Sequence, residues 1–183
     1  TQVALCDAQY GTSQSNNGYF NMNPNNSNSG GWANSYHRRT LLGNTGTPTS
    51  PPSNSLLAAM PADLRAVMKA VTKYSDNTGG GSNTASYVTS TTDYLFELAE
   101  FEYHGARTYA NSAEQNYQQQ YAYYQAGNSK IHYKHNATGT AARVWCRSVY
   151  AGDTYIFCRV NANGGASYGT AHYSWGVAPG FAA

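Results

Sequence analysis

The chain has 183 residues, a formal net charge of +2 and only 11% charged residues. This length is typical of one globular domain with a real core. The low charge excludes the electrostatic footprint of a nucleic-acid-binding protein, and no run of about 18 apolar residues predicts membrane insertion. We therefore expect a single domain over residues 1–183, in which residues 1–20 are a linker or the remnant of a longer chain.

Tyrosine accounts for 17 residues, and Asn, Ser, Thr and Gly fill much of the remainder. Disordered chains are poor in aromatic residues, so this composition favours a folded domain. Tyr, Ser, Gly and Asn are also the residues that dominate antibody binding surfaces. Two interpretations stay open: a binding surface of that kind, or a β-rich secreted or virion protein in which tyrosines cover the sheet faces.

The first half of the chain predicts two helices. Residues 29–42 carry Trp32, Tyr36, Arg39 and Leu42 at helical spacing, and Gly43-Asn44 ends this segment. Residues 45–55, with three prolines, predict a loop. Residues 61–74 give the clearest helix, because Pro61 suits the first helical position and one face is apolar: Leu64, Val67, Met68 and Val71.

The second half is mostly extended. Residues 87–92 predict a strand, 94–103 a strand or short helix, and 107–127 a short helix or ordered loop. A Gly/Asn/Ser loop is expected over 161–169, and the alternation over 171–177 predicts a last strand. Helices followed by strands predict an α+β fold, with two helices packed on a small antiparallel sheet and long irregular loops.

Two runs rich in β-branched and aromatic residues flank the turn Ala151-Gly152-Asp153 and predict a hairpin. A midpoint at Gly152 places Cys146 opposite Cys158 and Tyr150 opposite Thr154. One face is then expected to be core: Val144, Cys146, Ile156, Cys158 and Val160. The other face is aromatic and cationic, too polar for a sealed interior: Trp145, Arg147, Tyr155, Phe157, Arg159 and Asn161.

No residue pattern predicts catalysis, a metal or a cofactor. Cys6, Cys146 and Cys158 have no metal-ligand spacing, and we expect free thiols because nothing indicates an oxidising compartment. Two other clusters have ordinary structural explanations: the carboxylates Glu97, Glu100 and Glu102, and the pair His132 and His135. We therefore expect a protein that is not an enzyme.

Six segments together resemble a bacterial and phage domain family of unassigned function that is common in gut microbes and their phages. They are Gly30-Gly-Trp-Ala-Asn-Ser-Tyr36, Leu41-Leu42, Met60-Pro-Ala-Asp-Leu-Arg-Ala-Val67, Thr91-Thr-Asp-Tyr-Leu-Phe96, Trp145-Cys-Arg-Ser148 and Gly176-Val-Ala-Pro-Gly-Phe181. Their order and spacing agree with that family from about residue 20 to the C-terminus. The chain departs from the family pattern at Val144, Cys146 and Val149, where Trp, Leu and Pro are usual.

The resemblance implies a C-type-lectin-like fold without the calcium-ligand motif of sugar-binding lectins, and no Glu-Pro-Asn or Gln-Pro-Asp triplet occurs here. Relatives of that fold include the variable proteins of diversity-generating retroelements, whose C-terminal segment is diversified and displayed. Residues 150–176 are rich in the residues that adenine-directed diversification produces. Another relative is the formylglycine-generating oxidase, but Cys146 and Cys158 do not match its copper-binding cysteine pair.

These observations predict a non-catalytic domain for ligand or receptor binding on a phage virion (fibre, tail or decoration protein) or on a bacterial surface. The expected partner is a protein or glycan receptor on a host or neighbouring cell, and the domain is expected to belong to a larger assembly. The expected contact residues lie on the C-terminal face: Trp145, Arg147, Tyr150, Asp153, Tyr155, Phe157, Arg159, Asn161, Tyr168, His172, Tyr173 and Trp175.

Alternatives remain for both the residues and the function. Trp145 and Trp175 would also serve to pack the sheet against the helices, and Arg147 to hold the C-terminal loop through backbone carbonyls. The alternative function is that of a structural virion or surface-layer subunit, whose aromatic face makes subunit contacts.

Overall fold

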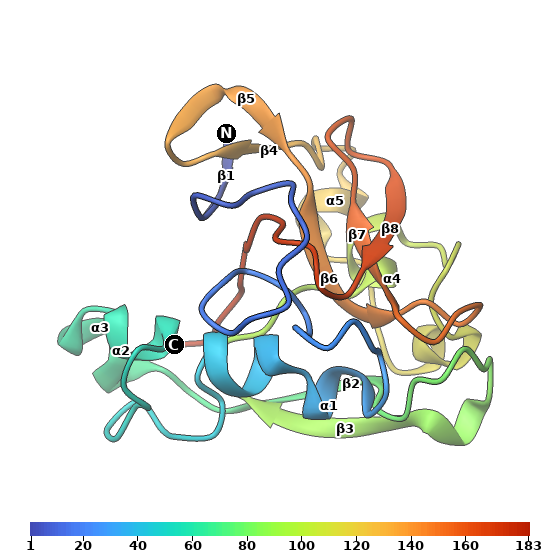
Figure 1. Ribbon diagram of the computed structural model, residues 1–183, viewed down its shortest axis with the longest axis horizontal. Helices are drawn as coiled ribbons and strands as arrows, with labels where there is room; N and C mark the ends of the chain where they lie inside the picture. Colours follow the sequence, from blue (N-terminus) through green and yellow to red (C-terminus); the bar gives the residue numbers. More distant parts are fainter.

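A computed structural model describes residues 1–183 and has an α+β fold of three small sheets, short helices and long loops (Figure 1). The first sheet has the order β1-β4-β5: Gln2–Ala4, His132–Lys134 and Ala137–Ala142. The second pairs β2 with β3: Val71–Asp76 and Val88–Asp93. The third has the order β6-β7-β8: Val144–Val149, Ile156–Val160 and Ala166–Thr170. All pairings are antiparallel except β1 with β4.

The helices are short and lie around these sheets. In Figure 1, α1 lies beside the β2–β3 ribbon, while α2 and α3 project to the left. The α-helices are α1 (Gly31–Asn34), α2 (Leu56–Ala59), α3 (Ala62–Val67), α4 (Glu100–His104) and α5 (Ala122–Gln125). A π-helical turn, η1 (His37–Leu41), and two 3-10 turns, η2 (Ala85–Tyr87) and η3 (Ser112–Asn116), complete the set.

Both predicted helices are longer than the real ones. The helix expected over 61–74 ends at Val67, because Met68 is extended and the chain from Val71 onward pairs with β3. The backbone N–H and C=O groups of β2, which includes Val71 and Thr72, form hydrogen bonds with β3. This strand pairing outweighs the helical spacing of the apolar residues. The helix expected over 29–42 is broken by Ser35, which is extended and whose hydroxyl donates to Trp32 O.

The strand over 88–93 confirms the prediction for 87–92, but the C-terminal strand lies elsewhere than predicted. Residues 166–170 form β8 along β7, although the sequence predicts a loop over 161–169. Residues 171–177 form only isolated bridges, which include Tyr173 with Ser13 and Val177 with Leu5. These bridges connect the N-terminal segment to the domain, and Ala4 and Cys6 of that segment are buried.

The predicted hairpin is present as β6 and β7. Val144 pairs with Val160 and Trp145 with Arg159, as a midpoint at Gly152 requires. The register then shifts, so that Val149 pairs with Phe157 and Tyr150 donates to Ile156 O instead of pairing with Thr154.

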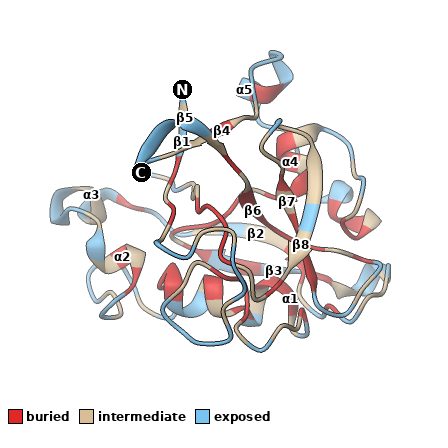
Figure 2. Ribbon diagram, turned by 45° about the horizontal axis from the view of Figure 1, so that its top comes forward, coloured by how far each residue is buried: buried red, intermediate tan, exposed pale blue.

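The expected contrast between a core face and an accessible face of this hairpin is wrong for β6, because every residue of that strand is buried (Figure 2). Cys146 and Cys158 pack in a cluster with Tyr103. Trp145 and Phe157 pack in a second, larger cluster that includes Trp32 and Leu42. The sheet thus separates two hydrophobic cores, and of its second face only Tyr155, Arg159 and Asn161 remain accessible.

Arg147 is fully buried on this second face and forms an ion pair with Glu102 of α4. Its Nη2 donates to Glu102 Oε1 over 2.8 Å, and Nη1 donates to the other carboxylate oxygen and to Glu97 O. Its Nε donates to Ser75 Oγ of β2 over 2.8 Å. Burial by itself would raise the pKa of Glu102, but the charge and hydrogen bonds of Arg147 outweigh it, so this pKa is lowered.

We expect Arg147→Ala to lower the free energy of unfolding by about 3–5 kcal/mol, because it leaves the Glu102 carboxylate buried without its partner. The matched control is Arg39→Ala, which removes an exposed arginine and should change stability by about 0.5 kcal/mol or less. Urea unfolding at neutral pH measures both. Similar losses in the two variants would show that the ion pair does not hold the fold.

Candidate functional site

The predicted contact residues separate into a buried group and an accessible group. Trp145, Arg147 and Phe157 are fully buried and belong to the core, and Trp175 is 7% exposed. The accessible residues are Tyr150, Asp153, Tyr155, Arg159, Asn161, Tyr168, His172 and Tyr173. The structural alternatives for Trp145 and Arg147 therefore agree with their positions, although the carbonyls that Arg147 binds belong to Tyr74 and Glu97 and not to the C-terminal loop.

Four of the predicted residues line one open recess of about 320 Å³ beside β7 and β8: Arg159, Tyr168, Tyr173 and Trp175. Gly169 and Thr170 complete its β8 wall. In the register of this sheet Gly169 lies opposite Phe157, so the position above the buried ring carries no side chain. The missing side chain helps to leave the recess open.

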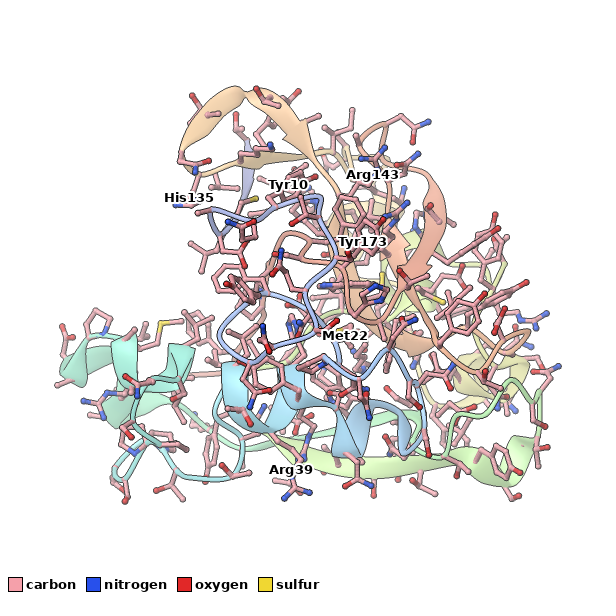
Figure 3. All side chains as sticks on the ribbon, viewed as in Figure 1. Tyr10, Met22, Arg39, His135, Arg143 and Tyr173 are labelled. Atoms are coloured by element: carbon pink, nitrogen blue, oxygen red, sulfur yellow. The ribbon has the colours of Figure 1, made fainter.

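The indole of Trp175 lies at the centre of a cluster of aromatic rings and cations. The guanidinium of Arg159 is 4.5 Å from its ring centroid and that of Arg143 is 5.2 Å away, both at cation–π range. The ring of Tyr173 stacks on the indole at 5.5 Å, and that of Tyr10 meets it edge-on at 5.4 Å. Figure 3 shows Tyr10, Arg143 and Tyr173 gathered in the same region.

A second aromatic group continues from the recess across the surface. The ring of Tyr168 stacks on Tyr150 at 5.1 Å and meets Tyr109 edge-on at 4.9 Å. Tyr168 is 42% exposed. Rigid tyrosine rings give a large contact area at low entropic cost, which suits a binding surface.

The other predicted residues surround the recess or lie apart from it. Asn161 accepts a hydrogen bond from Arg143 Nε over 3.0 Å and thereby orients that guanidinium. The ring of His172 is 5.4 Å from that of Tyr173. Asp153 lies in the hairpin turn, where its carbonyl accepts from Asn28, and Tyr155 is exposed nearby.

Tyr10, Tyr109 and Arg143 belong to this surface, but sequence reasoning did not single them out. Tyr10 comes from the N-terminal segment and accepts a hydrogen bond from Arg143 N over 2.7 Å. No spacing rule connects residues so far apart. Arg143 begins the run that contains Trp145, and its cationic side chain next to that run was the only available signal.

The clustered carboxylates have separate structural partners. Glu97 lies 2.9 Å from Nε2 of His37. Glu100 accepts from the backbone N–H groups of the loop 108–110. Together with the pairing of Glu102 and Arg147, these contacts support the structural explanation of all three residues.

The cysteines and the predicted histidine pair likewise lie in structural surroundings. All three cysteines are free thiols, and burial raises the pKa of Cys146 and Cys158 well above the usual value. Burial lowers the pKa of His132 to about 4, and His135 accepts from Cys6 N. No group of three or more His, Cys, Asp or Glu side chains is arranged to hold a metal ion. None of the helices has the length and apolar character needed to cross a membrane.

Glu114 of η3 has a perturbed carboxyl group that sequence reasoning did not single out. Burial raises its pKa to about 7, although hydrogen bonds from Ser148 Oγ and Asp76 N oppose the shift. In the folded state Glu114 keeps a proton up to about pH 7. An unfolded chain loses that proton near the ordinary value of 4.5. Its contribution to stability therefore falls as the pH rises through this window.

We expect the stability of the wild-type protein relative to Glu114→Gln to fall by roughly 3 kcal/mol between pH 4.5 and 7. His104 and His132, with pKa values lowered to about 4, titrate with the opposite sign but are common to both proteins. Urea unfolding of the two proteins across this range measures the difference. A difference that does not change with pH would contradict a protonated Glu114.

Comparison with known proteins gives a family but no relative of established function. No curated protein and no solved structure matches the chain. One family model, described as Domain of unknown function (DUF6273), matches residues 8–182. Because this match covers almost the whole chain, the protein belongs to the family described as Domain of unknown function (DUF6273).

Proposed function

We propose that the chain is a non-catalytic, C-type-lectin-like display domain that binds a ligand or receptor through the recess beside β7 and β8. The observation that carries the proposal is the cluster at this recess, where Arg159, Tyr168, Tyr173 and Trp175 meet on an accessible surface. Concave sites with aromatic walls and a few polar groups are the usual form of ligand-binding sites.

The support beneath this surface suits a display role. Trp145 and Phe157 are fully buried behind the β7–β8 surface, so the backbone that carries the contact residues is fixed by the core. The accessible tyrosines are held by ring contacts, since Tyr168 stacks on Tyr150 and Tyr173 stacks on Trp175. A rigid frame with exposed aromatic residues reduces the entropy lost on binding.

The proposed location is the surface of a phage particle or a bacterial cell, and the proposed partner is a receptor on a host or neighbouring cell. The resemblance of six sequence segments to a family found in gut microbes and their phages supports this location. Diversification of the C-terminal segment by a retroelement is part of the same proposal, and the Tyr, Asn, Ser and His content of residues 150–176 supports it.

A specific observation favours the alternative of a structural subunit. An open apolar groove of about 510 Å³ runs between the two chain ends and α5. Val3, Tyr123 and Phe181 line it and are 49%, 51% and 44% exposed. Exposed apolar residues gathered in this way are typical of contacts with another protein.

The first test compares Tyr168→Ala with Tyr117→Ala, because each removes one exposed tyrosine from a different part of the surface. Binding of the labelled chain to a panel of fixed bacterial cells should fall at least about tenfold in Tyr168→Ala and less than about twofold in Tyr117→Ala. Thermal unfolding checks that both variants fold. Equal effects would contradict the proposal, and a loss confined to Phe181→Asp would favour the apolar groove instead.

The second test is sequencing of the encoding locus across a natural population. Under diversification, substitutions should concentrate at adenine-containing codons of accessible residues such as Tyr155, Tyr168 and Tyr173. Asn111, whose codons also begin with adenine, is fully buried outside this segment and serves as the control that stays unchanged. A segment without variation, or with equal variation at Asn111, would contradict a diversified binding surface.

A further inference from the structure

Two hydrogen-bond donors border the recess without adequate partners. Trp175 is only 7% exposed, and its indole Nε1 is buried without a hydrogen-bond partner. An indole N–H can only donate, and a buried donor left unpaired is costly. Arg159 makes a single hydrogen bond, from Nε to Ser167 Oγ, and this bond is long at 3.5 Å.

Gly169 lies against both donors. A Cβ atom at this position would lie 2.9 Å from Trp175 Nε1 and 3.1 Å from Arg159 Nη1. Any side chain here would therefore crowd both donors, whereas glycine leaves them next to each other at the floor of the recess. An acceptor group that enters the recess over Gly169 approaches both of them.

The charges around this volume are positive and unpaired. Arg143 and Arg159 both lie at the Trp175 ring, and neither forms an ion pair with a carboxylate. Lys134 lies 4.0 Å from the ring centroid of Tyr10, at the edge of the same cluster. Burial, and then repulsion from Arg143, lowers the pKa of Arg159 to about 10. An anion would relieve that repulsion.

We propose that the recess binds the acidic group of a saccharide, a carboxylate or a sulfate, between the guanidinium of Arg159 and the indole N–H of Trp175. This inference rests on the proposed ligand-binding function and names its ligand class. Arginine forms paired, charge-assisted hydrogen bonds to planar or tetrahedral oxyanions, and the indole N–H supplies a further donor.

The walls of the recess favour a saccharide over an acidic segment of a protein. A volume of about 320 Å³ is at the small end of ligand pockets and suits a single ring-sized group. The rings of Tyr168 and Tyr173 line the same volume and can pack against the C–H face of a sugar. Protein partners instead cover about 800 Å² on each side of a specific interface.

The test titrates the full chain with four probes and follows the heat of binding. The probes are an oligogalacturonate, a carrageenan oligosaccharide that carries sulfate but no carboxylate, a neutral galacto-oligosaccharide of the same length, and a polyglutamate peptide. We expect at least one acidic saccharide to bind at least about tenfold more tightly than both the neutral saccharide and the peptide. Comparison of the first two probes separates a carboxylate from a sulfate.

Three variants locate the binding, each checked for folding by thermal unfolding. Arg159→Gln removes the charge, Trp175→Phe removes only the indole donor, and Gly169→Ala places a methyl group between the donors. Each should weaken binding of the acidic saccharide at least about fivefold and leave the weak binding of the neutral saccharide unchanged. The charge-matched control is Arg39→Gln, on the far side of the domain in Figure 3, which should have no effect.

Three results would overturn the inference, and they differ from failure of the proposed function. Equal affinity for neutral and acidic saccharides, or an unchanged affinity in all three variants, would show that the recess does not bind an anion. The Tyr168→Ala effect on cell binding could still stand in that case, and the ligand would then be neutral. Tighter binding of polyglutamate than of every saccharide would assign the site to an acidic protein. If Tyr168→Ala had no effect on cell binding either, the function itself would fail.

Discussion

The buried ion pair of Arg147 and Glu102 is the interaction on which the rest of the structure depends. The α-helices are four to six residues long, too short to be stable by themselves. Arg147 connects its own strand β6 to α4, to β2 and to the carbonyl of Glu97 in the preceding loop. A single planar guanidinium therefore fixes the relative positions of segments that have little regular structure to hold them together.

Other buried polar groups act in the same way on the loops. The carboxylate of Asp93 accepts from the indole of Trp32 and from Arg38. Glu100 accepts three backbone N–H groups of a loop that has no sheet partner for them. In a fold with long irregular segments, buried side-chain acceptors replace the missing ladders and satisfy the backbone. Functional interpretation of buried carboxylates in such a fold must first account for this structural role.

The sequence predicted the elements that short local patterns specify. It did not predict features that depend on contacts between residues far apart in the chain. The strand at 88–93 and the hairpin of β6 and β7 follow from β-branched residues and a turn signal. The helix over 61–74 was too long because pairing of Val71 with Asp93 is not visible in its spacing. Arg147 was assigned to an accessible face because nothing near it in the sequence indicates Glu102. Of the recess, the sequence predicted Arg159, Tyr168, Tyr173 and Trp175, but not Tyr10 or Arg143, which the fold brings to the same indole.

The residues that form the recess also differ in whether their codons contain adenine. Its floor consists of Gly169 and the indole of Trp175, with Trp145 and Phe157 behind them. Tryptophan and phenylalanine codons contain no adenine, and glycine codons carry it only where the change is silent. Tyrosine and histidine codons, as at Tyr168, His172 and Tyr173, contain adenine at a coding position. A mutator that acts on adenine could thus replace Tyr168 and Tyr173 in the walls of the recess, but neither Gly169 nor Trp175 in its floor.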